Sequence, residues 1–178
     1  MRNEKSEMRW LLEDQIYDLC APINLMRSFI NSKGFDPSTS YTLSVFRLCN
    51  HGLIISLFKL HEIIKNYGAI IEGMPEELKS PFTKVNKLIL SKEIPQFRNR
   101  YVAHIFEKKK GEVGKPLSVK KGMELLEKIM GKSIEEMLVF YEWVYPENYN
   151  ENGDSVVAIV QRVRDHCLTF CVPGEKRS

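Results

Sequence analysis

Hydrophobic residues recur along most of the chain at spacings of three and four, the period of an amphipathic α-helix. The first such stretch runs from Glu4 to Ser32, and its apolar positions are Met8, Leu11, Leu12, Ile16, Leu19, Cys20, Ile23, Met26 and Ile30. Pro22 lies inside it, so we expect a kink or a split there. Gly and Pro residues over 31–37 then predict a loop.

Two further helices are predicted in the middle of the chain. Hydroxyl side chains at 38–40 are suited to cap the second helix, which runs to about Tyr67 with Gly68 as a plausible C-cap. This helix is apolar over more than one face, which places it at the centre of a bundle. The third helix opens at Pro75 with early acidic residues and continues to about residue 90.

The helical period stops over residues 107–121, where six lysines surround glycine and proline, so this segment reads as a basic loop. A helix capped by Ser118 then extends to just before Pro146. The last apolar segment, 156–171, fits a strand or a helix. Helical spacing after an Asp154-Ser155 cap favours a C-terminal helix over about 154–171.

These elements predict an all-α fold, a single-domain helical bundle of five or six helices over residues 1–178. The chain has no internal repeat and no alternation of strands with helices that would indicate a parallel sheet. With 43% hydrophobic and 28% charged residues, its 178 residues are enough for one buried core.

Composition places the protein in the cytoplasm. The N-terminus lacks the apolar stretch of a secretory signal, and no apolar run approaches the roughly 18 to 20 residues of a membrane span. The four cysteines, Cys20, Cys49, Cys167 and Cys171, are too scattered for a disulfide scaffold. A net charge of +3 is too small by itself to indicate a polyanion partner.

Three apparent motifs are rejected, so we expect no metal and no cofactor. His61-Glu62 begins like a zinc-protease helix, but lysine occupies the position of the second histidine. The segment 111–116 has the wrong spacing for a phosphate loop and no preceding strand. His166, Cys167 and Cys171 lack a fourth ligand, and buried cysteines commonly pack as small hydrophobes.

The fourth predicted helix begins near 93–95 and carries the most pointed chemistry. Its apolar stripe is Ile94, Phe97, Tyr101 and Ile105. On an ideal helix, Arg98 and His104 lie about 60° to either side of Tyr101, while Arg100 and Asn99 lie further away. Arginine binds phosphate oxygens bidentately and imidazole transfers protons near neutral pH, so this pair suits phosphate chemistry. The alternative is an arginine that snorkels and a histidine in a core or capping position.

The string Arg98-Asn99-Arg100-Tyr101-Val102-Ala103-His104 resembles the signature of the HEPN superfamily of small helical proteins, with a histidine six places after an arginine. The residues that follow, Lys108-Lys109-Lys110-Gly111 and Lys115 to Ser118 before another helix, resemble its abortive-infection branch.

The resemblance implies a metal-independent endoribonuclease acting in phage defence or as a toxin. Such a protein works as a homodimer, with two motifs in one cleft, and an antitoxin protein is a possible partner. Arg98, Asn99 and His104 would be catalytic: a ribose 2′-hydroxyl attacks the adjacent phosphate, with His104 as general acid or base. Arg100, Lys108, Lys109 and Lys110 would contact RNA.

Two other functions stay open. A non-catalytic helical module of a toxin–antitoxin or defence system would bind a nucleotide or a partner protein, with Arg98 and His104 gripping an anion without chemistry. A purely structural helical protein would use the same two residues for packing and capping.

Overall fold

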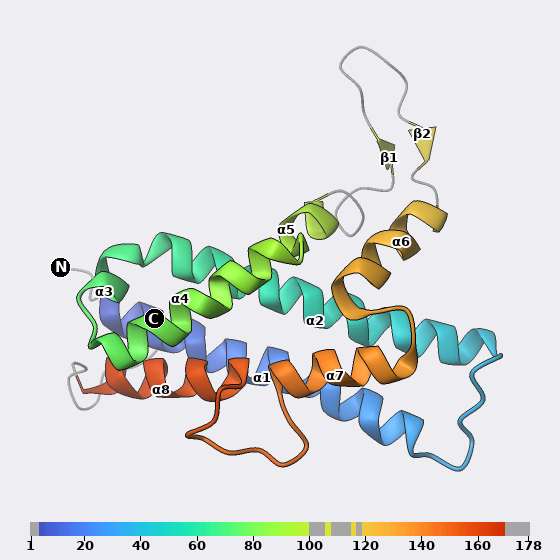
Figure 1. Cartoon of the computed structure of the whole chain (residues 1–178), viewed down its shortest axis with the longest axis horizontal. Coiled ribbons are helices and arrows are strands. Elements are labelled where there is room, and N and C mark those ends of the chain that lie inside the picture. The colour runs from blue at the N-terminus through green and yellow to red at the C-terminus, as the bar shows by residue number, and fades with distance from the viewer. Residues whose placement is uncertain (1–3, 100–105, 108–114, 117–118, 170–178) are drawn as a thin grey trace.

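The computed structural model describes residues 4–99, 106–107, 115–116 and 119–169 (Figure 1). The fold is all-α, as the sequence predicts. Within these residues the helices are α1 (Glu4–Ile30), α2 (Ser40–Asn66), α3 (Gly68–Glu72), α4 (Glu76–Ser91), α5 (Ile94–Phe97), α6 (Val119–Met130), α7 (Ile134–Val144) and α8 (Val156–Leu168). A two-residue antiparallel pairing joins β1 (Phe106–Glu107) to β2 (Lys115–Pro116).

Helices α1 and α2, of 27 residues each, form the centre of the bundle and run side by side in opposite directions (Figure 1). The predicted start of α2 is confirmed, because the Thr39 side chain accepts a hydrogen bond from the Thr42 amide. Pro22 does not split α1, which continues unbroken to Ile30. Gly68 opens α3 instead of ending α2, whose C-cap is Tyr67.

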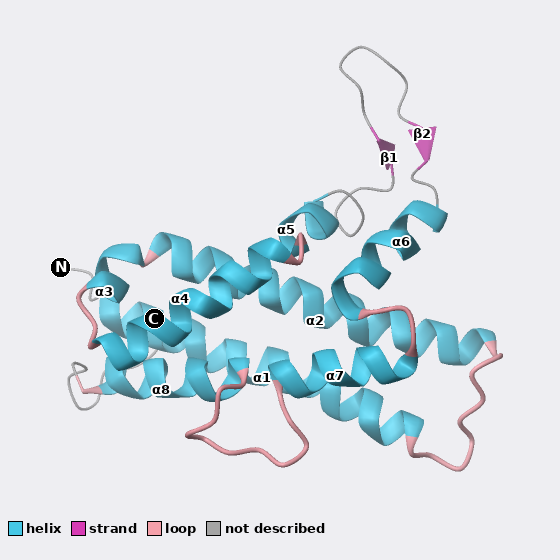
Figure 2. Ribbon diagram, viewed as in Figure 1, coloured by secondary structure: helices cyan, strands magenta, loops and turns pink. Residues whose placement is uncertain are grey.

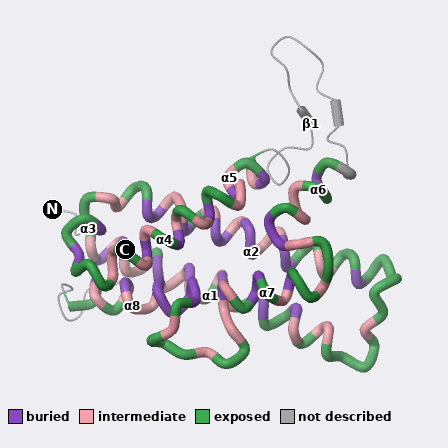
Figure 3. Tube along the Cα trace, in the orientation of Figure 1, coloured by how far each residue is buried: buried purple, intermediate pink, exposed green. Residues whose placement is uncertain are grey.

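Buried residues recur along α1 and α2 and along the helices that pack on them (Figure 3). Helices α1, α4 and α5 all pack on α2, as expected for the central helix. Among the described residues, α2 alone has the length and mean hydropathy, 1.3, of a helix able to cross a membrane. Its packing against three neighbours is equally typical of the core helix of a bundle.

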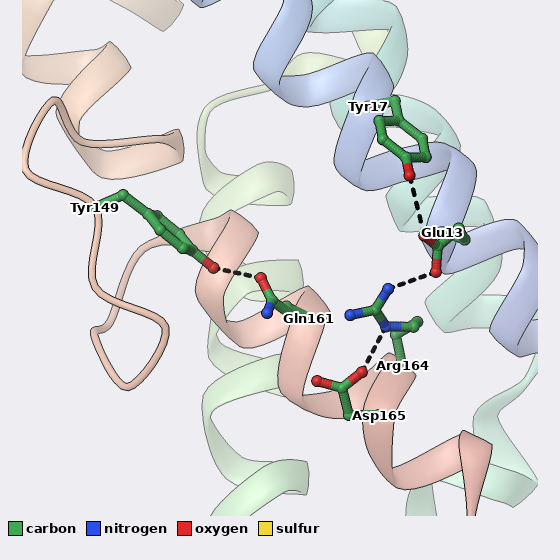
Figure 4. A network of polar contacts seen from close by, with 6 residues as sticks. All are labelled: Glu13, Tyr17, Tyr149, Gln161, Arg164 and Asp165. Atoms are coloured by element: carbon green, nitrogen blue, oxygen red, sulfur yellow. Dashed lines mark hydrogen bonds and ion pairs between the residues drawn. The ribbon is translucent and has the colours of Figure 1, made fainter.

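The C-terminal segment is a helix, not a strand, as its spacing predicts. Ser155 caps α8 by accepting a hydrogen bond from the Ala158 amide, and residues 156–160 are all buried. Helix α8 packs on α1 and α4. A polar network reinforces this contact, because Arg164 forms ion pairs with Glu13 of α1 and with Asp165 (Figure 4).

The predicted single helix between Ser118 and Pro146 is wrong: the chain breaks it into α6 and α7. Gly131 adopts a φ of 98°, and Ser133 caps the new helix by accepting a hydrogen bond from the Glu136 amide. The described residues therefore contain more helices than the five or six that we predicted. Eight helices occur in the described residues, and α3 and α5 have only five and four residues.

The predicted basic loop over 107–121 is shorter than expected. Phe106 pairs with Pro116 and Glu107 with Lys115, and the resulting ladder lies away from the helices (Figure 2). Because α6 begins at Val119, the last part of the predicted loop is helical.

Candidate functional site

The first two residues of the Arg98 to His104 motif follow a short helix whose start is anchored to α6. Glu93 has φ 56° and ψ 25°, the left-handed conformation, which costs a residue other than glycine roughly 1 to 2 kcal/mol. Its carboxylate lies 2.6 Å from the Lys128 ammonium of α6. Ile94 and Phe97 are fully buried, which confirms the described part of the predicted apolar stripe.

We had predicted a regular helix to residue 105, but α5 ends at Phe97, and residues 100–105 lie outside the described residues. After α5, Arg98 and Asn99 lie in a wider π-helical turn. Such turns change the angle between successive side chains and are frequent at functional sites. Asn99 therefore does not point away from Arg98 as an ideal helix would require: Arg98 Nη1 donates a hydrogen bond to Asn99 Oδ1 at 3.0 Å.

The Arg98 side chain lies over an aromatic ring of α2, that of Phe58. The guanidinium carbon lies 4.9 Å from the centre of the Phe58 ring. An arginine in this position is attracted by the electrons of the ring and loses little freedom when it binds an anion. Among the described residues, Asn99 is its one hydrogen-bond partner, and this bond uses one of the five N–H donors of a guanidinium.

The structure adds an imidazole near the same Phe58 ring, which our sequence analysis missed. The His61 ring lies 6.2 Å from the same Phe58 ring, and His61 Nδ1 lies 2.8 Å from Asn86 Oδ1 of α4. Because an amide oxygen only accepts, this contact places a hydrogen on Nδ1, and Nε2 lies 3.7 Å from the Glu62 carboxylate. We had considered His61 only as part of a rejected zinc motif.

A second histidine that our sequence analysis missed, His51, lies near Phe97, the residue just before the motif. The His51 and Phe97 rings are 5.7 Å apart and inclined by 65°. Burial, helped by the positive charge of Arg47, lowers the pKa of His51 and favours the neutral ring. His51, Phe58 and His61 are spaced by seven and three residues, so they lie on one face of α2. The sequence shows this spacing, but the spacing does not indicate which helix packs on this face of α2.

The remaining predicted site residues, Arg100, His104, Lys108, Lys109 and Lys110, lie outside the described residues. The structure thus brings together Arg98 and Asn99 from the predicted set, and adds Phe58 against the Arg98 guanidinium, with His61 near the same ring. This arrangement presents a guanidinium able to hold phosphate oxygens, and an imidazole that contacts Asn86.

The described residues offer no cluster of three or more histidine, cysteine or acidic side chains suited to hold a metal ion. Their three cysteines are free thiols. Burial raises the pKa of Cys20 to about 11 and that of Cys49 above its ordinary value, so both thiols stay protonated near neutral pH. They are suited to packing, the role that we expected of Cys167, which is also buried.

Comparisons with known proteins agree with this architecture. The family model described as the HEPN-like integron domain matches residues 11–135, a range that contains the whole of the Arg98 to His104 motif. No curated protein matches the sequence.

Among solved structures, an integron cassette protein from the mobile metagenome of V. paracholerae has the same fold. The TM-score is 0.74, the sequence identity is 20%, and the match covers 94% of this chain and 98% of that chain. At this identity the likeness shows the fold alone. The family match spans more than half of the sequence, and the chain therefore belongs to the HEPN-like integron domain family.

Proposed function

We propose that this protein is a metal-independent endoribonuclease that acts in phage defence or as a toxin. The observation that carries the proposal is the placement of Arg98, whose guanidinium lies over Phe58 and is hydrogen-bonded to Asn99 within the HEPN-type motif. A guanidinium fixed in this way is suited to stabilise the extra negative charge of a phosphorane. The abortive-infection branch, which the lysine-rich segment suggests, stays part of this proposal.

The reaction needs no group beyond side chains. A base removes the proton of the ribose 2′-hydroxyl, and the oxygen attacks the adjacent phosphorus. The bond from phosphorus to the 5′-oxygen breaks, and a protonated group gives that oxygen its proton. The products are a 2′,3′-cyclic phosphate and a 5′-hydroxyl. His104 is the acid or base, Arg98 stabilises the phosphorane, and Asn99 orients Arg98.

The proposal also includes RNA binding, dimerisation and control by an antitoxin. Arg100, Lys108, Lys109 and Lys110 contact the RNA backbone, where each cation displaces counterions. A homodimer brings two motifs to one cleft in the cytoplasm, and an antitoxin protein restrains the enzyme.

A second candidate is a non-catalytic module of a defence system that binds a nucleotide or a partner. The stacking of Arg98 on Phe58 favours this function as well, because a held guanidinium grips an anion whether or not chemistry follows.

The test is cleavage of structured and unstructured RNA in excess chelator. Wild-type protein is compared with His104→Ala, with Arg98→Ala, and with Arg47→Ala as a control arginine on the exposed surface of α2. Product ends are identified, and each variant is first checked for an unchanged melting temperature.

We expect cleavage that leaves a 2′,3′-cyclic phosphate, its loss in His104→Ala and Arg98→Ala, and its retention in Arg47→Ala. If no variant or wild-type protein cleaves RNA but wild type binds nucleotides and Arg98→Ala does not, the binding module replaces the nuclease. Equal cleavage by all four proteins would rule out both candidates.

A further inference from the structure

A cavity of about 390 Å³ lies next to the start of α5, between the end of α4 and the helices α6 and α7. Phe140 and Trp143 form an aromatic wall, and Gly131 lies in the turn between α6 and α7. Val139, 70% exposed, stands at the lip. The volume falls within the roughly 300 to 1,000 Å³ of small-ligand pockets.

Lys92 brings a positive charge into this cavity. Its ammonium lies 5.1 Å from the centre of the Phe140 ring and 5.9 Å from that of Trp143. It donates a hydrogen bond to the Ile129 carbonyl at 2.9 Å, which is its one hydrogen bond within the described residues. A lysine has three donors, so two remain for a ligand. The Phe140 and Trp143 rings are 5.3 Å apart and inclined by 59°, so a flat ligand that reaches these donors can stack on only one of them.

The charges around the cavity do not favour an anion. Lys92 and Lys128 contribute two positive charges, Glu127 and Glu136 contribute two negative ones, and Lys128 is already ion-paired with Glu93. Both carboxylates would repel a phosphate group. A neutral ring with hydrogen-bond donors and acceptors on its edge would instead pair with the lysines and the carboxylates. Unstacked RNA bases are recognised in this way, by stacking on aromatic side chains and by hydrogen bonds along their edges.

The position of the cavity connects it to the proposed cleavage site. Lys92 precedes Arg98 by six residues, and the one turn of α5 between them rises by only about 6 Å. A base in the cavity would therefore belong to a nucleotide close to the phosphate held by Arg98.

We propose that this cavity is a guanine-binding subsite, in which the base stacks on the half-buried Trp143 ring, beside Phe140. Lys92 donates to O6 or N7 of guanine, a pairing that lysine commonly makes, and Glu127 or Glu136 accepts from its ring and amino N–H groups. Adenine offers Lys92 only N7, because an amino group replaces O6, and it lacks the N1–H and 2-amino groups that the carboxylates would accept from. The role in RNA selection rests on the proposed nuclease function, but the binding of guanine does not.

Binding is measured by NMR on the indole N–H signals of the two tryptophans, with Trp143→Phe used to assign them. The full chain is titrated with guanosine monophosphate, adenosine monophosphate and inorganic phosphate. Lys92→Met removes the donor, and Lys87→Met, an exposed lysine of the same helix, is the matched control. Val139→Trp, at the exposed lip, closes the cavity and serves if Lys92→Met fails to fold.

We expect guanosine monophosphate to shift the Trp143 signal, with about tenfold weaker binding of the adenosine compound and of Lys92→Met. Lys87→Met should bind as wild type does, and Val139→Trp should bind neither nucleotide. Equal shifts with inorganic phosphate, equal binding of both nucleotides, or full binding by Val139→Trp would overturn the proposal.

Cleavage of oligonucleotides that contain a single guanine separates this inference from the nuclease function. Guanine binding without any cleavage would support the subsite and remove the nuclease. Cleavage with no dependence on guanine and no nucleotide-induced shift would keep the nuclease and remove the subsite.

Discussion

Position 98 requires the shape of a guanidinium as well as its charge. Arg98 simultaneously covers the Phe58 ring and donates to Asn99 Oδ1, and a lysine ammonium lacks the planar fork needed for both contacts. We predict that Arg98→Lys reduces RNA binding or cleavage nearly as strongly as Arg98→Ala. The unfolding free energy should change by less than about 1 kcal/mol, as expected for an accessible cation–π contact.

The comparison is made by filter binding and single-turnover cleavage, with urea unfolding of each variant. An Arg98→Lys protein with wild-type activity would mean that only the charge matters, and the stacking on Phe58 would then have no functional role.

Tyr141 is a buried residue whose hydroxyl is satisfied by another buried side chain. Its O–H donates to Asn50 Oδ1, and the Asn50 amide contacts the Met137 sulfur at 3.6 Å. Burial, with a contribution from Cys49, raises the pKa of Tyr141, so the hydroxyl keeps its proton.

Tyr141→Phe should lower the unfolding free energy by about 1 to 3 kcal/mol, because it leaves the buried Asn50 oxygen without a donor. Thermal and urea unfolding measure this change. Tyr17→Phe is the control, since Tyr17 is 64% exposed and its hydroxyl bonds to the accessible Glu13. Equal effects of the two substitutions would show that the Asn50 contact does not contribute.

His51 makes stability depend on pH in a definite direction. Its pKa is lowered by burial and by Arg47, so the unfolded chain binds its proton more readily than the folded protein. The contribution of neutral His51 is therefore complete above the ordinary pKa of 6.5 and is lost as the pH falls through the lower folded value.

Urea unfolding at pH 7.5, 6.5 and 5.5 should show falling stability for the wild type and a shallower fall for His51→Gln. Asp36 and Glu135, whose pKa values are lowered by hydrogen bonds, change protonation only at more acidic pH. Parallel pH profiles for the two proteins would contradict the assignment to His51.

At the scale of the elements, Gly131 determines that α6 and α7 are two helices. Its φ of 98° suits glycine, and an added Cβ would lie 2.2 Å from the Glu136 Cβ. Gly131→Ala should therefore cost more than about 1 kcal/mol of unfolding free energy. Gly52→Ala, inside α2 with no atom within 4 Å of the added Cβ, should instead stabilise by about 0.5 to 1 kcal/mol.

Urea unfolding of the two alanine variants tests this pair of predictions. The decisive outcome is the sign of the change in unfolding free energy. If both substitutions stabilised the protein, the α6–α7 turn would tolerate an ordinary side chain, and the break would have another cause.

Sequence periodicity predicted the long helices because each has an apolar stripe that faces the core for several turns. It missed the break at Gly131 because Ile129, Met130, Ile134 and Met137 keep the helical spacing across the turn. It also missed the change of geometry at Arg98, because Glu93 carries no signal for a left-handed conformation.

The candidate site was predicted only in part for a related reason. Arg98 and Asn99 are neighbours in sequence, and a local motif was enough to select them. The pairing of His61 with Asn86 spans 25 residues and depends on how α4 crosses α2, which the spacing within either helix does not specify.

At the scale of the whole molecule, the bundle extends beyond the region matched by the family model. Residues 11–135 include α2 to α6 but lack nearly all of α7 and the whole of α8. Helix α8 buries residues 156–160 and packs on α1 and α4. A protein ending at residue 135 would expose those apolar faces.

We predict that the 1–135 truncation does not fold cooperatively. Circular dichroism should show lower helicity without a sharp thermal transition, and a dye that binds exposed apolar surface should bind more strongly. Addition of a peptide covering 134–169 should restore part of the transition. A sharply melting 1–135 protein would show that α8 is dispensable for the core.

The contact between α1 and α8 has a further consequence during synthesis on the ribosome. Helix α1 is made before α8, so the face of α1 that α8 covers stays open until translation passes residue 168. At the usual speed of elongation this interval is on the order of ten seconds. The part of the core that lies between α1 and α8 therefore forms only late in synthesis.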